Sequence, residues 1–517
     1  MRIKNVLQYL EGTAARLASK TAVTDGQGRQ ALTFEALLQC ARSIGAALLR
    51  RDLEGARVAV LMDRSPDAIA AMLGIWYAGG VSVLVDVSQP MPRMQAMLSQ
   101  ASVCAVLFDE SHRASADALS PCALAFDDVS EEGADENMLA AVRRRQIDTD
   151  PIYMVFTSGS TGVPKGVLGY HRALIDYAEA LLPALGVCED DVLGCQSPLH
   201  FDAPFKEILS TMVLGATTVL IPRRCFALPM LLLNFLRENG ITAIFWVASA
   251  LSQISALGAL DVCPPTHLRL VAFGSEVFPR VHYDRWRAAL PEATFYHLYG
   301  PTEATGMSCV WRADRALDAG EKIPIGAPLD NTDAMLIGDE GTRILPCEGR
   351  ESEVGELYLR GSCLTHGYYA MHEQTAAAFV QNPLQKDYPE TVYRTGDMAA
   401  YNAHGELIFL GRRDAQIKHM GHRVELGEIE EKAMEYAQIT DACCVYLADV
   451  QKLILFYQGQ AEEREVMRML QNTLPRYMLP RYAVRVEAIP RTQNGKRDRM
   501  RLLAIAKAQF ETENKED

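Results

Sequence analysis

The sequence has few positive charges relative to negative ones, no paired-cysteine motif and no long apolar run. Its 51 Lys and Arg against 65 Asp and Glu give a formal net charge of −14, which opposes attraction to nucleic-acid phosphate or anionic lipid. Its 12 cysteines show no CxxC spacing, which argues against zinc sites and a secreted disulfide framework. No uninterrupted apolar run approaches the roughly 18 residues of a membrane span. We therefore expect a cytoplasmic protein with reduced thiols, and neither nucleic acid nor a membrane as a partner.

The length and the pattern of apolar residues predict more than one domain. The 517 residues, 49% of them hydrophobic, exceed what one core usually supports. From about Leu32 to Val277, short apolar runs alternate with amphipathic stretches, which is typical of βαβ units and parallel sheets. From Ile323 to Leu410, closely spaced strand candidates indicate an antiparallel, barrel-like region. We predict an α/β plus α+β fold, with a large N-terminal domain of two βαβ-type subdomains and a barrel-like region at 1–411, and a small mobile C-terminal α+β domain at 412–517.

A glycine-rich loop follows the strand candidate that ends near Phe156. It contains hydroxyls, glycines and a lysine: Thr157, Ser158, Gly159, Ser160, Thr161, Gly162 and Lys165. Such a loop can wrap a polyphosphate through its backbone N–H groups, but a flexible polar linker has a similar composition. The Walker pattern is absent, because Val163 follows Gly162, and the GxSxG and SxxK patterns are absent around Ser160.

The loop sequence TSGSTGVPKGV resembles the signature loop of the adenylate-forming superfamily, which includes acyl-CoA synthetases, luciferases and the adenylation domains of nonribosomal peptide synthetases. Further motifs of that family follow in its order: LTFEAL, WYAGGVSVLVD, HFDAP, LYGPTE, GELYLRG, YRTGD, GRRDAQIKHMGHRVELGEIE, LPRYMLP and NGKRDR. The resemblance therefore covers about Leu32 to Arg499. It implies a free-standing enzyme, also similar to D-alanine–carrier-protein ligases, that uses ATP and Mg²⁺ to convert a carboxylate into an acyl-adenylate.

The resemblance also implies roles for individual residues. Lys496 is similar to the family's catalytic lysine, although a lysine beside an Asn-Gly turn is often only solvated. Thr302 offers a hydroxyl to the α-phosphate, and Glu303 a carboxylate to Mg²⁺. Asp414 matches the position about which family members rotate the C-terminal domain between the two half-reactions.

Adenosine contacts are implied for a second group of residues. Tyr299 and Gly300 match the adenine side of the site, although His297 stands where the family usually has Asn. Asp397 resembles the aspartate that accepts both ribose hydroxyls, which its two oxygens allow. Arg412 adds a cationic contact. The alternative is that Asp397 and Arg412 form only a surface ion pair.

Asp202 bears on the nature of the acid, because family members that activate amino acids carry an aspartate here for the substrate ammonium. The alternative is a helix N-cap with Pro204 in the first turn, or an i,i+4 ion pair with Lys206. The family's pocket positions correspond to Ala203, Lys206, Phe245, Val271, Phe273, Leu298, Gly306 and Met307. This crowded, apolar set favours a small amino acid such as alanine or D-alanine. If the Lys206 ammonium faces the pocket, an acidic substrate such as aspartate fits instead.

The acceptor of the activated acid is expected to be a thiol from another molecule. The sequence shows no carrier domain and no attachment serine after Arg499. A separate carrier protein bearing 4′-phosphopantetheine is the first expectation, and coenzyme A is the second. The alternative function is an acyl- or aryl-CoA ligase, in which Asp202 only caps a helix.

Overall fold

The structure is a computed structural model that describes residues 3–159, 164–347, 349–414, 416–491 and 497–510. The chain divides into two compact units. The larger unit comprises Met1–Val87, Leu98–Phe156 and Gly166–Arg413, and the smaller unit comprises Ser88–Met97, Thr157–Lys165 and Asp414–Asp517. The smaller unit also contains two short segments from the first third of the chain, so its division from the larger unit is not a single point in the sequence. The predicted domain boundary between residues 411 and 412 stays a prediction.

The larger unit contains a nine-stranded sheet in the order β15-β14-β13-β12-β11-β9-β10-β1-β2. Its central strands are parallel, and β2, β14 and β15 pair antiparallel at its edges. Because the central strands are parallel, the carboxyl ends of β11, β12 and β13 meet at one edge of the sheet. The bounds are β1 (Thr21–Thr24), β2 (Ala31–Thr33), β9 (Val192–Cys195), β10 (Thr217–Leu220), β11 (Ala243–Val247), β12 (Leu270–Gly274), β13 (Thr294–Tyr299), β14 (Cys309–Arg312) and β15 (Ala327–Pro328).

A second sheet has six strands in the order β6-β5-β3-β4-β7-β8. Strands β3, β4, β5, β6 and β7 pair in parallel. Nearly all residues of β3, β4 and β5 are buried, as expected when helices cover both faces of a sheet. The bounds are β3 (Arg57–Leu61), β4 (Val81–Leu84), β5 (Ala105–Phe108), β6 (Ala123–Ala125), β7 (Pro151–Thr157) and β8 (Lys165–Tyr170).

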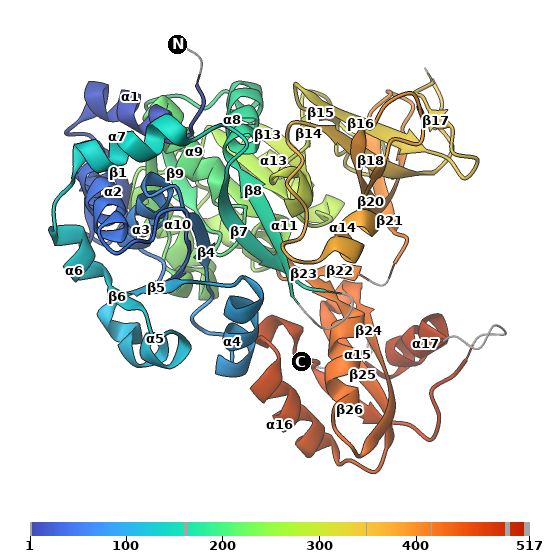
Figure 1. The fold of residues 1–517 in the computed structure, drawn as a ribbon. Coiled ribbons are helices and arrows are strands. Elements are labelled where there is room, and N and C mark those ends of the chain that lie inside the picture. Colours follow the sequence, from blue (N-terminus) through green and yellow to red (C-terminus); the bar gives the residue numbers. More distant parts are fainter. Residues whose placement is uncertain (1–2, 160–163, 348, 415, 492–496, 511–517) are drawn as a thin grey trace. The chain divides into compact units, whose positions relative to one another are not determined.

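Helices connect and cover these strands. Helix α2 begins after Thr33, whose hydroxyl accepts from the Ala36 N–H at 3.2 Å, and it packs on α1, α3, α6 and α7 (Figure 1). A Cβ at Gly74 would lie 2.6 Å from the Ile44 side chain, so glycine permits the close approach of α2 and α3. The helices of this unit are α1 (Leu7–Leu17), α2 (Phe34–Leu49), α3 (Pro66–Tyr77), α5 (Arg113–Leu119), α6 (Phe126–Glu131), α7 (Glu136–Arg145), α8 (His171–Leu185), α9 (Phe205–Leu214), α10 (Pro229–Glu238), α11 (Ala248–Ala256), α12 (Ala259–Val262), α13 (Arg280–Ala289) and α14 (His372–Ala378).

The third sheet of the larger unit is antiparallel, in the order β17-β16-β18-β20-β19 with β21 beside β20 (Figure 1). It corresponds to the barrel-like region expected from the sequence. The bounds are β16 (Thr332–Ile337), β17 (Arg343–Ile344), β18 (Gly355–Gly361), β19 (Phe379–Gln381), β20 (Thr391–Tyr401) and β21 (Leu407–Arg412).

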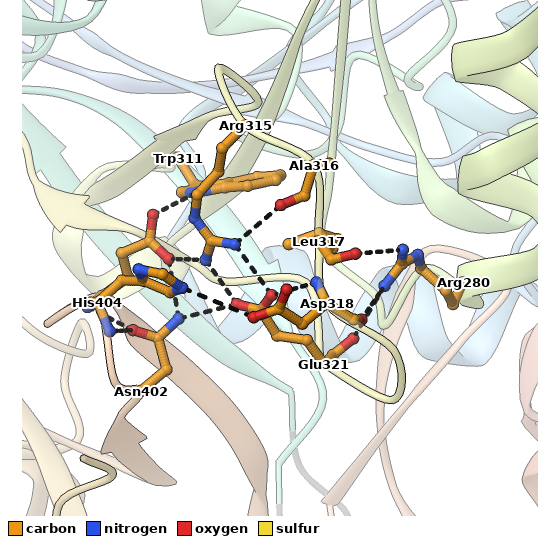
Figure 2. Close-up of polar contacts among 10 residues, drawn as sticks. Arg280, Trp311, Arg315, Ala316, Leu317, Asp318, Glu321, Asn402 and His404 are labelled. Atoms are coloured by element: carbon orange, nitrogen blue, oxygen red, sulfur yellow. Dashed lines mark hydrogen bonds and ion pairs between the residues drawn. The ribbon is translucent and has the colours of Figure 1, made fainter. Parts of the chain in front are cut away.

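An arginine network fixes the loop between β14 and β15 (Figure 2). Arg280 on α13 donates to the backbone carbonyl of Leu317 at 2.9 Å. Arg315 donates to both carboxylate oxygens of Glu321, at 2.9 and 2.5 Å, and Asn402 donates to Glu321 at 3.2 Å. Since Asn402 follows β20, the network ties a loop of the nine-stranded sheet to the third sheet.

The smaller unit has its own core and two small sheets. Strands β22 (Gln416–His419) and β23 (His422–Glu425) form a hairpin, and β24 (Ile439–Leu447), β25 (Lys452–Gly459) and β26 (Tyr482–Arg485) form a three-stranded sheet. Helices α15 (Leu426–Met434), α16 (Glu463–Thr473) and α17 (Arg499–Phe510) complete it. Helix α4 (Met91–Gln100) begins in this unit, where Arg93 pairs with the fully buried Glu428 at 2.5 Å.

The predicted α/β plus α+β fold class is confirmed. The sequence pattern did not predict the β22–β23 hairpin or helix α17. Among the residues that the structure describes, no helix combines the length and the apolar character that crossing a membrane requires.

Candidate active site

A cavity lies at the carboxyl ends of β11, β12 and β13, beside the start of α9. About 230 Å³ of space, part of it open to solvent, lies between its walls. Six residues predicted to line the substrate pocket are part of its wall, namely Ala203, Lys206, Phe245, Phe273, Leu298 and Met307, and Ser197, Trp246, Val247, Ala272, Gly274 and Ser275 complete it. The edge formed by the carboxyl ends of parallel strands is the usual place for ligands in such sheets, so this cavity is the candidate pocket for the acid.

Two predicted pocket residues lie outside this wall. Val271 is fully buried in the core cluster that also contains Ile244 and Phe295, and its neighbour Ala272 contributes to the cavity instead. Gly306 has a φ of +86°, and a Cβ there would lie 3.1 Å from the Tyr177 hydroxyl. Gly306 therefore adopts a backbone conformation that favours glycine, in the loop between β13 and β14.

Lys206 is one of the residues that line the cavity. Its side chain is buried, and its ammonium donates to the Ala203 carbonyl at 2.8 Å. Both residues line the cavity. Among the described residues, Lys206 forms no ion pair with Asp202 within 4.0 Å, and the alternative of an i,i+4 pair is not supported.

Asp202 does not cap helix α9. The N-cap position is Pro204, which provides no side-chain cap, and the Asp202 backbone carbonyl accepts from the Phe205 N–H at 3.0 Å. Burial raises the pKa of the Asp202 carboxyl, while a hydrogen bond with Thr302 and the charge of Lys206 oppose that rise. The structure thus brings Thr302 close to Asp202 and Lys206, although about 100 positions separate it from them in the sequence.

Glu207, the neighbour of Lys206 on α9, is a buried acid that the sequence reasoning missed. Glu207 is 1% exposed, and among the described residues neither of its carboxylate oxygens has a hydrogen-bond partner. Burial raises its pKa to about 7 against the opposing charges of Lys206 and Arg64. Arg64 donates to the carbonyls of Gln196 at 2.7 Å and Ser197 at 3.1 Å, at the end of β9. Glu207 could have been suspected only from its position next to Lys206.

The loop after β13 holds the predicted phosphate and metal contacts. A Cβ at Gly300 would lie 2.1 Å from the Gly306 carbonyl, so only glycine allows this turn. Glu303 is fully buried, and it accepts from the Tyr368 hydroxyl at 2.6 Å. A fixed carboxylate beside the Thr302 hydroxyl is the hard oxygen donor that Mg²⁺ prefers, so Glu303 fits the predicted metal ligand.

Asp397 accepts hydrogen bonds from two directions. Its Oδ2 accepts from the Tyr299 hydroxyl, and its Oδ1 pairs with Arg412 at 2.7 Å. Asp397 is 5% exposed and the Arg412 side chain 16%, so they form a buried ion pair and not a surface pair. A carboxylate has about four acceptor positions, and the two bonds described leave capacity for hydroxyl donors of a ribose.

Tyr299 and His297 project from the same strand, β13. Burial and then the Asp397 charge raise the pKa of Tyr299, so its hydroxyl stays protonated and remains a donor. His297, where the family usually has Asn, stacks on Phe273 with ring centroids 4.9 Å apart, and its Nδ1 lies 2.6 Å from the Pro324 carbonyl oxygen. His297 therefore supports a wall of the cavity.

The remaining predicted residues belong to the smaller unit. Thr157 ends β7 and Lys165 begins β8. The Ser158 hydroxyl donates to the Arg423 carbonyl at 2.8 Å. The buried Thr157 hydroxyl has no hydrogen-bond partner among the described residues, so it keeps its capacity to bind a phosphate oxygen. The other residues of the loop, Ser160, Thr161 and Gly162, lie outside the described residues.

Two functional predictions concern the C-terminal segment. Lys496, the predicted catalytic lysine, lies outside the described residues. Asp414, the predicted hinge, is the first residue of the C-terminal segment of the smaller unit, and its carboxylate accepts from the Gln416 N–H at 3.2 Å.

Comparisons with known proteins agree with the predicted family. A model described as AMP-binding enzyme matches residues 10–369, and one described as AMP-binding enzyme C-terminal domain matches residues 428–496. Zwittermicin A synthase ZmaJ from Bacillus cereus is 31% identical over 92% of this chain and 90% of its own length. The structure of holo-PA1221, an NRPS protein containing adenylation and PCP domains, is 25% identical with a TM-score of 0.81, over 97% of this chain and 84% of that chain.

Other relatives are much longer than this chain. Tyrocidine synthase 1 from Brevibacillus parabrevis is 29% identical over 96% of this chain, which spans 45% of that protein. Bacitracin synthase 1 from Bacillus licheniformis is 30% identical over 96% of this chain, which spans only 9% of that protein. The chain therefore corresponds to one part of such synthases.

Proposed function

This chain belongs to the AMP-binding enzyme family, and from that premise we propose that it activates an amino acid with ATP and passes it to the thiol of a separate carrier protein. In the first step an oxygen of the substrate carboxylate bonds to the α-phosphorus, the bond to the bridging oxygen breaks, and pyrophosphate leaves. In the second step the thiolate sulfur of 4′-phosphopantetheine bonds to the carbonyl carbon and AMP leaves. The thiol proton goes to solvent.

The residues of the larger unit suit the first step. The Tyr299 ring and Gly300 provide the adenine side of the site, Asp397 accepts ribose hydroxyls, and Thr302 directs its hydroxyl at the α-phosphate. Glu303 would hold Mg²⁺, which would supply positive charge to stabilise the phosphate oxygens. Lys496 is proposed to supply a further positive charge at the reacting oxygens, and Asp414 to be the hinge that moves it away before the thiol arrives.

Asp202 is the observation that carries the choice of an amino acid. It is not a helix cap, and its carboxyl group lies close enough to Thr302, Lys206 and Glu303 for each to affect its pKa. A carboxyl group that is shielded from water is more stable as an anion when it has a cationic partner. The ammonium of an α-amino acid provides that partner, whereas a fatty or aryl acid does not.

Substrate-dependent ATP–pyrophosphate exchange tests this proposal. The wild-type chain should catalyse exchange with an amino acid, and Asp202→Asn, which keeps the shape of the side chain but removes its charge, should lose that exchange. Asp176→Asn is a matched control, because Asp176 lies on α8 and bonds to Asn331 at 2.6 Å, away from the cavity. Exchange with fatty or aryl acids and with no amino acid would support the alternative, an acyl- or aryl-CoA ligase.

Lys206 favours an acidic side chain on that amino acid over a small apolar one. An ammonium has three donors, and the contact with Ala203 accounts for one. Burial raises the pKa of Glu207, which disfavours its charged form, so that it compensates the Lys206 charge only in part. A substrate carboxylate that reaches the cavity wall would accept from the remaining donors, so aspartate is our first candidate, and alanine or D-alanine the second.

The acceptor is proposed from the relatives. Holo-PA1221 contains adenylation and PCP domains in one protein, and a carrier protein is therefore the expected partner here. Transfer of the activated amino acid to a panel of holo carrier proteins, compared with coenzyme A, distinguishes the two acceptors by mass spectrometry of the thioester.

A further inference from the structure

Two buried carboxylates and three partly exposed arginines form a cluster in the smaller unit, with arginines on both sides of residues 492–496. Asp441 on β24 accepts from Arg491 and from Arg497, the latter at 2.8 Å from its Nε. Arg491 immediately precedes residues 492–496, and Arg497 immediately follows them. One carboxylate thus binds both ends of a short segment, and we call Asp441, Arg491 and Arg497 the Asp441 clasp.

The backbone joins the same two ends. Arg491 and Arg497 pair as an isolated antiparallel bridge, and the Asp498 N–H donates to the Pro490 carbonyl at 2.8 Å. The Asp498 carboxylate accepts from the Arg501 N–H at 3.0 Å, in the first turn of α17. Residues 490–491 and 497–498 are therefore neighbours in space, and both main-chain and side-chain contacts hold them together.

Glu430 on α15 anchors the clasp to the core of the unit. It accepts from Arg497 at 2.9 Å, from Arg499, and from the Cys444 N–H at 2.8 Å. Glu430 is 4% exposed and Asp441 7%. Hydrogen bonds between ionised groups are among the strongest in proteins, and partly buried ones are screened little by salt, so the position of Arg497 is closely defined.

Lys496 is joined to Arg497 by one peptide bond, although it lies outside the described residues. We propose that Asp441 is a positioning residue for adenylation, because it fixes both ends of the segment that carries the catalytic lysine. This inference rests on the proposed function and on the role of Lys496. Fixing the flanking residues in advance reduces the conformational freedom that must be lost when the ammonium meets the reacting phosphate.

The test uses Asp441→Asn in the full chain, with Asp333→Asn as a matched control. Asp333 also contacts two arginines, Arg343 at 2.7 Å and Arg360 at 3.0 Å, but it lies on β16 of the larger unit. The Asp441 variant should lower kcat of ATP–pyrophosphate exchange by about 10- to 100-fold, the loss that a small misplacement of a catalytic group produces. The KM values for ATP and the amino acid should stay close to those of the wild type. Transfer from a supplied aminoacyl-adenylate to the thiol should be unchanged, because that step does not use Lys496.

A second variant distinguishes the loss of the clasp from a general loss of folding. Hydrogen–deuterium exchange tests the clasp without relying on the proposed function. Arg491→Gln removes a side chain that is 51% exposed, so it releases one end of the segment without opening the core. Hydrogen–deuterium exchange should become faster in peptides covering 489–499 in both clasp variants and stay unchanged in Asp333→Asn.

The outcomes separate the inference from the proposed function. Unchanged protection of peptides 489–499, unchanged kcat, or equal losses in both half-reactions in Asp441→Asn and Arg491→Gln would overturn the positioning role. A wild-type chain that supports no exchange with any amino acid would overturn the proposed function, and the deuterium measurement would still decide whether the clasp holds its segment.

Discussion

Replacing Tyr299 by phenylalanine separates the two parts that this side chain is expected to play. The change removes the hydroxyl that donates to Asp397 and keeps the ring proposed to contact adenine. Both residues are 5% exposed, and Arg412 keeps its contact with the other carboxylate oxygen at 2.7 Å. Hydrogen bonds to charged groups contribute about 1.5–3 kcal/mol, so the free energy of unfolding of the larger unit should fall by about 2 kcal/mol.

The same variant should bind ATP almost normally, because the ring stays in place and Asp397 keeps its ion pair with Arg412. Urea unfolding followed by tryptophan fluorescence measures the stability, and exchange kinetics at varied ATP measure the KM. Tyr388→Phe is the control, since Tyr388 is 57% exposed. An unchanged stability together with a large rise in the KM for ATP would refute the reasoning, because the hydroxyl would then act on the nucleotide and not on Asp397.

Three further predictions follow from buried or paired charges. Burial lowers the pKa of His171 to about 3, so the unfolded chain binds a proton that the folded chain does not, and stability should fall by up to about 1.4 kcal/mol per pH unit from about 6.5 down to 3. Urea titrations at pH 7 and pH 5 should show that His171→Gln loses less stability between these pH values than the wild type does. A variant of the exposed His372 should lose as much stability as the wild type. The hydrogen bond from Arg315 lowers the pKa of Glu321 to about 2, so its stabilising effect is complete above the unfolded pKa and lost as the pH falls towards 2; the melting temperature of Glu321→Gln should therefore approach that of the wild type at pH 3 and lie below it at pH 7. Lys206→Met should reduce exchange with aspartate and increase exchange with an apolar amino acid, whereas equal effects on both would contradict a contact between Lys206 and the substrate side chain.

The parallel sheets were predictable because their strands are buried on both faces and read as continuous apolar runs, as in Leu270–Gly274. Helix α17 was not, because only Leu502 and Ala506 are buried along it, and so narrow a stripe gives no clear helical period. The β22–β23 hairpin was also missed, since its polar residues carry little alternation between apolar and polar positions.

The candidate site was predictable where a motif places neighbouring residues together, as in Thr302 and Glu303. Pairings between distant segments could not be read from the sequence. Arg64 and Glu207 are 143 positions apart, and only the fold brings them close enough for the Arg64 charge to affect the pKa of Glu207. The choice of Ala272 over Val271 in the cavity wall depends on how strand β12 faces its neighbours, which the resemblance alone did not determine.

The central claim is that this chain activates an amino acid through its carboxylate, with Asp202 as the partner of the ammonium. ATP–pyrophosphate exchange with wild-type and Asp202→Asn chains over all D- and L-amino acids and a set of fatty and aryl acids tests it most directly. We expect wild-type exchange with one amino acid or a few, aspartate first among them, and none in the variant. Exchange only with acids that lack an amino group, at equal rates in both chains, would contradict it.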